Sequence, residues 1–183
     1  MIGLGDLKGS CINVYIANRP PLDEYQFLDE IRPLREGEVA YIAQETGNHW
    51  RKIFNVFAKF IYALELSTLK ADQRKIEPVF KSWQAYRDEQ LLQKGSSLRL
   101  VFTSPELQDA KKSNTIQIIM GKQYAIDLGF HEDQHEGMVR LDSDFVIWPD
   151  KKIIICPYFD YRQLSNIKID RLVELVQSIN GNN

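Results

Sequence analysis

The chain has 183 residues, of which 44% are hydrophobic and 26% are charged. This composition excludes an intrinsically disordered or collagen-like chain, and the length predicts one α/β domain spanning residues 1–183. The 23 basic and 25 acidic side chains give a formal net charge of −2, so no overall positive field draws the protein to nucleic acid or to an anionic membrane.

No apolar run approaches the roughly 18 residues of a membrane-spanning helix, so no membrane contact is expected. Asp6 and Lys8 interrupt the N-terminal segment, which predicts that it is not a signal peptide. Cys11 and Cys156 are far apart in the sequence and lie beside apolar residues, which predicts two buried thiols. We therefore expect a cytoplasmic protein with no disulfide, no metal and no other cofactor.

The first half of the chain predicts one strand and two helices. The strand covers residues 12–17, which are rich in β-branched and aromatic side chains, and a pair of prolines ends it. A short helix is expected over 22–31. The most regular pattern lies between 50 and 66, where apolar side chains recur at helical spacing and Asn48 is a plausible N-cap. Its apolar stripe is predicted to pack on the sheet through Phe54, Phe57 and Ile61.

The second half begins with a polar stretch over 70–94, in which Pro78 suits the first turn of a helix. Further elements follow in chain order: strands at 98–102 and 116–120, a helical turn at 124–128, a β-hairpin made of 145–148 and 153–156, and a helix at 169–179 capped by Ser165 or Asn166. Strands alternating with helices predict an α/β fold. We expect a mostly parallel four-stranded sheet with helices on both faces and a β-hairpin before the last strand.

Polar side chains follow each of the four main predicted strands. They are Asn18 and Arg19 after the first, Thr103 after the second, Lys122 after the third, and Tyr158, Asp160, Tyr161 and Arg162 after the last. Ligands of open α/β sheets bind outside the carboxyl ends of the strands, so these residues are predicted to form one ligand-binding site. The cationic side chains among them suit an anion such as phosphate. The alternative is that these are ordinary polar turns.

The loop after the last strand has the most distinctive composition. Tyr158, Phe159 and Tyr161 stand beside Asp160 and Arg162. An aromatic face can stack on a nucleobase, and Arg162 can bind phosphate or pair with Asp160. The alternative is that the aromatic side chains close the end of the core.

Residues 131–135 spell H-E-x-x-H, the pattern in which two histidines bind zinc and a glutamate activates water. Gly129 and Gly137 bracket the segment, and the apolar back of a rigid helix is missing, so we interpret it as a chance match. Zinc-dependent hydrolysis through His131, Glu132 and His135 is therefore a minor alternative. His49, the remaining histidine, is expected to serve the helix cap or an interface, and Gly3 and Gly5 lack the preceding strand of a phosphate loop.

Three segments resemble the uracil-DNA glycosylase superfamily. Residues 116–129 resemble its third strand, glycine-plus-basic turn and following helix; 156–165 fall where its last loop lies, and 16–20 where its first, water-activating loop lies. The resemblance implies a four-stranded parallel α/β fold. It does not carry over the catalytic residues, because Cys156 or Pro157 replaces the last-loop histidine and Thr103 replaces an asparagine.

The sequence thus predicts a protein that binds an anionic nucleotide-like or nucleic-acid ligand at the carboxyl edge of its sheet. Whether it is an enzyme is left open. The alternative is a protein–protein interaction module that uses the aromatic loop and the mixed-charge segment 70–94, with another protein as its partner.

Overall fold

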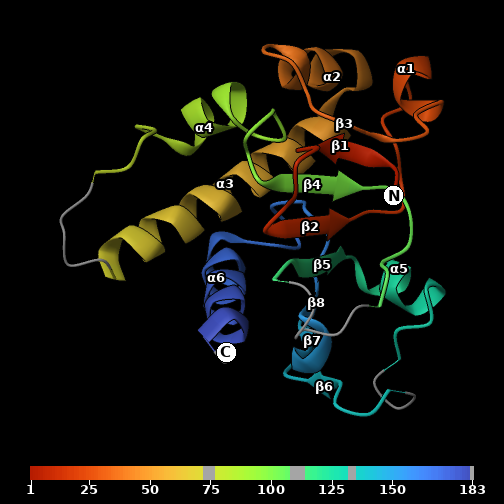
Figure 1. The fold of residues 1–183 in the computed structure, drawn as a ribbon, viewed down its shortest axis with the longest axis vertical. Helices are drawn as coiled ribbons and strands as arrows, with labels where there is room; N and C mark the ends of the chain where they lie inside the picture. The colour runs from red at the N-terminus through yellow and green to blue at the C-terminus, as the bar shows by residue number, and fades with distance from the viewer. Residues whose placement is uncertain (72–76, 108–113, 132–134, 182–183) are drawn as a thin grey trace.

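The computed structural model describes residues 1–71, 77–107, 114–131 and 135–181. Their strands form a single mixed sheet of eight strands in the order β3-β1-β4-β2-β5-β8-β7-β6 (Figure 1). The strands are β1 (Gly3–Gly5), β2 (Ile12–Tyr15), β3 (Ile31–Arg32), β4 (Leu98–Val101), β5 (Ile116–Met120), β6 (Val139–Arg140), β7 (Val146–Trp148) and β8 (Ile153–Cys156). The helices are α1 (Asp23–Gln26), α2 (Glu38–Thr46), α3 (Asn48–Ala71), α4 (Trp83–Glu89), α5 (Lys122–Asp127) and α6 (Asn166–Gly181).

The centre of the sheet is parallel. Strands β4, β2, β5 and β8 are neighbours that run in one direction, so their carboxyl ends share one edge. The hairpin is also confirmed, because β7 pairs antiparallel with β8 across the short helical turn Pro149–Lys151. The prediction of a four-stranded sheet is wrong, since β1, β3, β6 and β7 extend it on both sides.

Strand β1 carries the two glycines that sequence reasoning left outside the sheet. It pairs antiparallel with β4 and parallel with β3. A Cβ atom at Gly3 or Gly5 would collide with the backbone carbonyl of Leu100 or Leu98, and Gly5 has a φ of +131°. The two glycines therefore let β1 lie unusually close to β4, a role that a search for phosphate loops does not detect.

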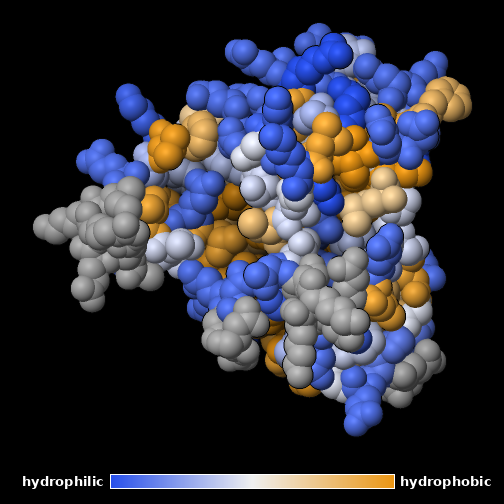
Figure 2. All heavy atoms as spheres, viewed as in Figure 1, coloured by the Kyte–Doolittle hydropathy of each residue, from blue (hydrophilic) through white to orange (hydrophobic). Residues whose placement is uncertain are grey.

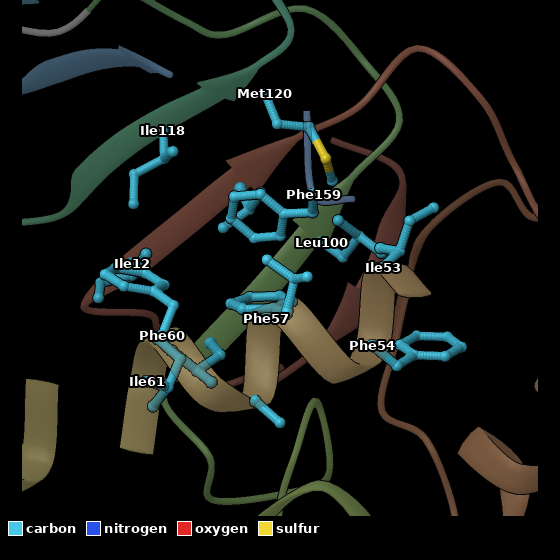
Figure 3. Packing of buried hydrophobic residues seen from close by; sticks show 14 of the residues in the cluster. Ile12, Ile53, Phe54, Phe57, Phe60, Ile61, Leu100, Ile118, Met120 and Phe159 are labelled. Carbon is cyan, nitrogen blue, oxygen red and sulfur yellow. The ribbon is translucent and has the colours of Figure 1, made fainter. Parts of the chain in front are cut away.

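One face of the sheet is covered by α3 and α6, and α2 and α4 pack against α3 (Figure 1). Figure 3 shows Phe57 and Phe60 of α3 meeting Phe159 beside the strands. Phe54, Phe57 and Ile61 are buried, as the helical stripe predicted. The other face carries a second cluster of buried apolar side chains, among them Tyr15, Ile119 and Ile155. Helix α5 is the one described helix that packs in this cluster, through Ala125, so helices lie on both faces but unevenly.

Several local predictions need correction. The helix expected over 22–31 is reduced to α1, because the chain turns into β3 at Ile31. In the polar stretch 70–94, the first two residues end α3, and α4 is the one further helix among its described residues. The hydroxyl of Ser82 accepts from the backbone N–H of Ala85 and caps α4, and Pro78 lies before it. Asn48, expected as the N-cap, is the first residue of α3. Helix α2, which ends just before α3 begins, was not predicted.

Cys156 is buried as expected, whereas Cys11 is exposed. The backbone carbonyl of Ser165 accepts from the N–H of Ile169, which places Ser165 at the start of α6, where a cap was predicted. Among the described residues, no helix has both the length and the apolar character needed to cross a bilayer.

Candidate functional site

Two cavities lie side by side at the carboxyl edge of the parallel strands. The first, which we call the edge cavity, has a volume of about 540 Å³ and is formed where β5 and β8 end, with Gly121, Pro157 and Tyr158 in its wall. The second, about 530 Å³, lies after β2 beside the start of α3. Ala17 lines both cavities, so the loop after β2 forms their common boundary.

Three basic side chains line the edge cavity: Lys122, Arg162 and Lys168. Asp144 is the acidic residue among its described lining, and its carboxylate lies 2.9 Å from Nζ of Lys168 and 3.8 Å from Nζ of Lys122. Lys122 also donates to the carbonyl of Ser143. Within the described parts of the chain, the guanidinium of Arg162 makes no ion pair. The cavity therefore carries an excess of positive charge.

Tyr158 and His49 separate the two cavities. Tyr158 Oη lies 3.1 Å from His49 Nε2, and the two rings stack with centroids 5.7 Å apart. Burial raises the pKa of Tyr158 to about 12, so the phenol keeps its proton at neutral pH and can donate it in this hydrogen bond. One face of the Tyr158 ring is thus supported by His49, and the residue borders the edge cavity.

Asp160 fixes the shape of the loop that follows β8. Its Oδ2 lies 2.8 Å from Nζ of Lys52 on α3, and its Oδ1 accepts from the backbone N–H of Arg162 at 2.9 Å. These bonds hold the pKa of the Asp160 carboxyl below its usual value. Asp160 is therefore a structural partner of Lys52 and lines neither cavity.

The three aromatic side chains of this loop have different surroundings. Phe159 is fully buried against Phe57 and Phe60, so it closes the core as the alternative interpretation predicted. Tyr161 is 54% exposed, and the charged end of Arg162 lies 5.8 Å from its ring centroid. Tyr158 is the aromatic member of the loop that reaches the edge cavity.

The first loop contributes to the second cavity. Asn18 and Arg19 line it, together with His49 and Trp50. The guanidinium of Arg19 donates to the carbonyls of Gln26 and Leu28 at 2.7 and 3.0 Å, so it ties its own loop together.

The predicted site residues therefore divide into groups. Lys122, Tyr158 and Arg162 come together at the edge cavity, Asn18 and Arg19 line its neighbour, and Thr103 lines neither. Sequence reasoning missed His49, Asp144 and Lys168 as site residues. The predicted topology could have indicated Lys168 as a site residue, because the helix after the last parallel strand starts near the edge where that strand ends. Nothing in the sequence links His49 to Tyr158, 109 positions away.

The H-E-x-x-H segment is only partly described, since Glu132 lies outside the described residues. His135 Nε2 lies 2.9 Å from the carbonyl oxygen of Gly129, and its ring packs on Trp148 with centroids 4.8 Å apart. In the parts of the chain that the structure describes, no three potential metal ligands gather together. His135 is thus held by a local carbonyl and an aromatic ring.

A comparison with models of protein families matches residues 2–177 to the model described as "Family of unknown function (DUF6942)". Searches among curated proteins and among solved structures gave no match. The geometry of the sheet edge therefore carries the functional argument.

Proposed function

Because the chain belongs to a family of unknown function, DUF6942, we propose its function from the sheet edge: the protein binds a nucleotide-like anion in the edge cavity. The observation that carries this proposal is the group formed by Lys122, Arg162 and Lys168 around one cavity. Asp144 offsets part of this charge through its bonds to the two lysines. Arg162 keeps a planar, bidentate donor available, and this geometry matches the oxygens of a phosphate.

The aromatic part of the ligand is assigned to Tyr158. Its ring lies at the wall of the cavity, and His49 supports it from behind. Stacking of a base on an aromatic ring is tolerant of base identity, so Tyr158 can hold the base without a specific contact to its edge. A volume of about 540 Å³ lies within the range of small-molecule sites, roughly 300–1,000 Å³.

The resemblance to the uracil-DNA glycosylase superfamily supports the location and leaves the chemistry open. Residues 16–20 and 156–165 belong to the loops after β2 and β8, and 116–129 include the turn after β5. All three segments therefore contribute to the carboxyl edge. Base excision is not part of the proposal, because Cys156, Pro157 and Thr103 stand where the superfamily's catalytic or polar side chains would be expected.

Calorimetric titration with four probes tests the proposal: inorganic phosphate, a nucleoside monophosphate, the matching nucleoside and a short single-stranded oligonucleotide. We expect the monophosphate to bind more tightly than the nucleoside or phosphate alone. Comparing the monophosphate with the oligonucleotide distinguishes a free nucleotide from a nucleic-acid strand. Arg162→Ala should weaken binding by about tenfold or more, since a hydrogen bond to a charged group contributes about 1.5–3 kcal/mol.

Arg171→Ala is the matched control, because Arg171 is an exposed arginine on α6 that pairs with Glu174 and lies outside the edge cavity. It should leave the affinity unchanged. Equal affinity in Arg162→Ala and in the unaltered protein would overturn the proposal. Absence of binding by all four probes, together with association that depends on protein concentration, would favour the interaction module instead.

A further inference from the structure

A third cavity lies away from the sheet edge, between the second half of α3, the segment before α4, and the turn before β4. Its volume is about 600 Å³, and none of its described lining residues borders either cavity at the edge. In the view of Figure 2, apolar atoms lie in a hollow to the left of the centre, in the region where α3 runs alongside and below α4 in Figure 1. The position makes it a separate site and not an extension of the edge cavity.

The walls of this cavity are mainly apolar. Leu64 and Leu69 supply the α3 side, and Phe80 faces them from the segment before α4. Val79, also in the lining, is 88% exposed, so an apolar side chain stands at the cavity's boundary with solvent. Such a surface gains free energy by contact with an apolar molecule.

Two polar groups in the cavity lack a partner. Glu65 is partly buried in the lining, and within the described residues its carboxylate has no hydrogen bond or ion pair. Burial raises the pKa of this carboxyl. Tyr86 is 1% exposed and lines the same cavity, and its hydroxyl has no hydrogen bond to any residue that the structure describes. Among the described residues no buried side-chain polar atom lacks a partner, so the Glu65 carboxylate and the Tyr86 hydroxyl are open to the cavity and not enclosed. Both are therefore free to bind a ligand that supplies hydrogen-bond donors.

The charge of the lining residues indicates which charge the ligand's hydrogen-bond donor should carry. Glu65 and Glu77 are both acidic, and no lysine or arginine occurs among the described lining residues. The two described carboxylates disfavour an anionic molecule, and a neutral one would leave the half-buried carboxylate of Glu65 without a counter-charge. A cationic head group joined to an apolar chain satisfies both the carboxylate and the walls.

We infer that the cavity between α3 and α4 binds a small amphiphilic amine, with its ammonium group on Glu65 and its apolar chain against Leu64, Leu69 and Phe80. The ammonium donates to the carboxylate and can donate a second hydrogen bond to the hydroxyl of Tyr86. This ligand is opposite in charge to the one assigned to the edge cavity, so the site is a second one and does not depend on the proposed function.

Three probes of equal chain length test the inference: hexylamine, which is cationic at neutral pH, neutral hexanol and anionic hexanoate. Binding to the folded protein raises the melting temperature, and titration calorimetry gives the affinities. We expect hexylamine to bind at least tenfold more tightly than hexanol, and hexanoate not to bind. Glu65→Gln should remove the preference for the amine while leaving hexanol binding unchanged.

Glu174→Gln is the matched control, since Glu174 is an exposed carboxylate on α6 outside this cavity. It should retain the preference for hexylamine. The melting temperature of each variant without ligand verifies that it folds. Equal binding of hexylamine and hexanol, no binding of either, or an unchanged preference in Glu65→Gln would each overturn the inference.

Discussion

Lys52 of α3 forms an ion pair with Asp160, which follows it by 108 positions in the chain, with Nζ 2.8 Å from Oδ2. The pair attaches the loop after β8 to α3. Because Lys52 neutralises Asp160, the guanidinium of Arg162 is not needed for that purpose. The ion pair of Asp160 is thus made by a lysine of α3, and the guanidinium of Arg162 has no ion pair within the described residues.

Replacing Lys52 with methionine should lower the free energy of unfolding by about 0.2–1 kcal/mol, because both partners are partly exposed. The pKa of Asp160 is lowered in the folded protein, so its contribution to stability is present above the ordinary pKa of 3.8 and is lost as the pH falls through the lowered value. Urea unfolding at neutral and acidic pH measures the effect. The difference between the unaltered protein and Lys52→Met should disappear at low pH.

Lys70→Met is the control for this substitution, since Lys70 is exposed in the last turn of the same helix. It should change stability little at either pH. A difference between Lys52→Met and the unaltered protein that persists unchanged in acid would show that the lysine acts through its methylene chain and not through its charge.

Phe57→Ala should cost about 3–5 kcal/mol of stability, because the removed ring leaves a cavity in a close-packed core. Phe57 is 0% exposed and its ring lies 5.6 Å from that of Phe159, between α3 and the sheet (Figure 3). Val79→Ala, at an exposed position, should stay within about 0.5 kcal/mol of the unaltered protein. A loss below about 1 kcal/mol for Phe57→Ala in denaturant unfolding would contradict this packing.

Gly5→Ala should destabilise the protein by about 1–3 kcal/mol more than Gly9→Ala, a cost typical of overpacking. Both glycines have a strongly positive φ, so the backbone strain of alanine is common to the two variants. Of these two glycines, only Gly5 would place a Cβ against backbone, that of Leu98 and Arg99 on β4, whereas Gly9 faces open space. Thermal unfolding of the two variants measures the difference. Equal losses would mean that β1 can move away from β4 at little cost.

The central fold was predictable because its signals are local. The buried strands β2, β4, β5 and β8 are short apolar runs bounded by turn residues, and α3 has a regular apolar stripe. The outer strands were missed for physical reasons. Strand β1 is built on glycines whose value lies in close contact with β4, and β3 and β6 have two residues each, too few for a period.

The candidate site was predictable where it follows directly from strand ends. Lys122 and Arg162 are at the edge because β5 and β8 stop there. The other contributions depend on packing between distant segments. Lys52 and His49 reach the loop after β8 from α3, and only the position of that helix on the sheet brings them there. Arg19 carries the charge expected of a ligand site, but carbonyls of its own loop engage it.

Two substitutions of Tyr158 separate stacking from hydrogen bonding. Tyr158→Phe keeps the ring at the cavity and loses the 3.1 Å contact with His49, so nucleoside monophosphate should bind nearly as in the unaltered protein. Tyr158→Ala removes the ring as well, and binding should weaken by about 1–3 kcal/mol, the contribution of one base stacked on an aromatic side chain. Inorganic phosphate has no base to stack, so its affinity should be similar in both variants. Parallel titrations with the two probes measure these effects. If Tyr158→Ala weakened phosphate as much as the monophosphate, the ring would act by shaping the loop that carries Arg162, and the assignment of Tyr158 as a stacking surface would be wrong.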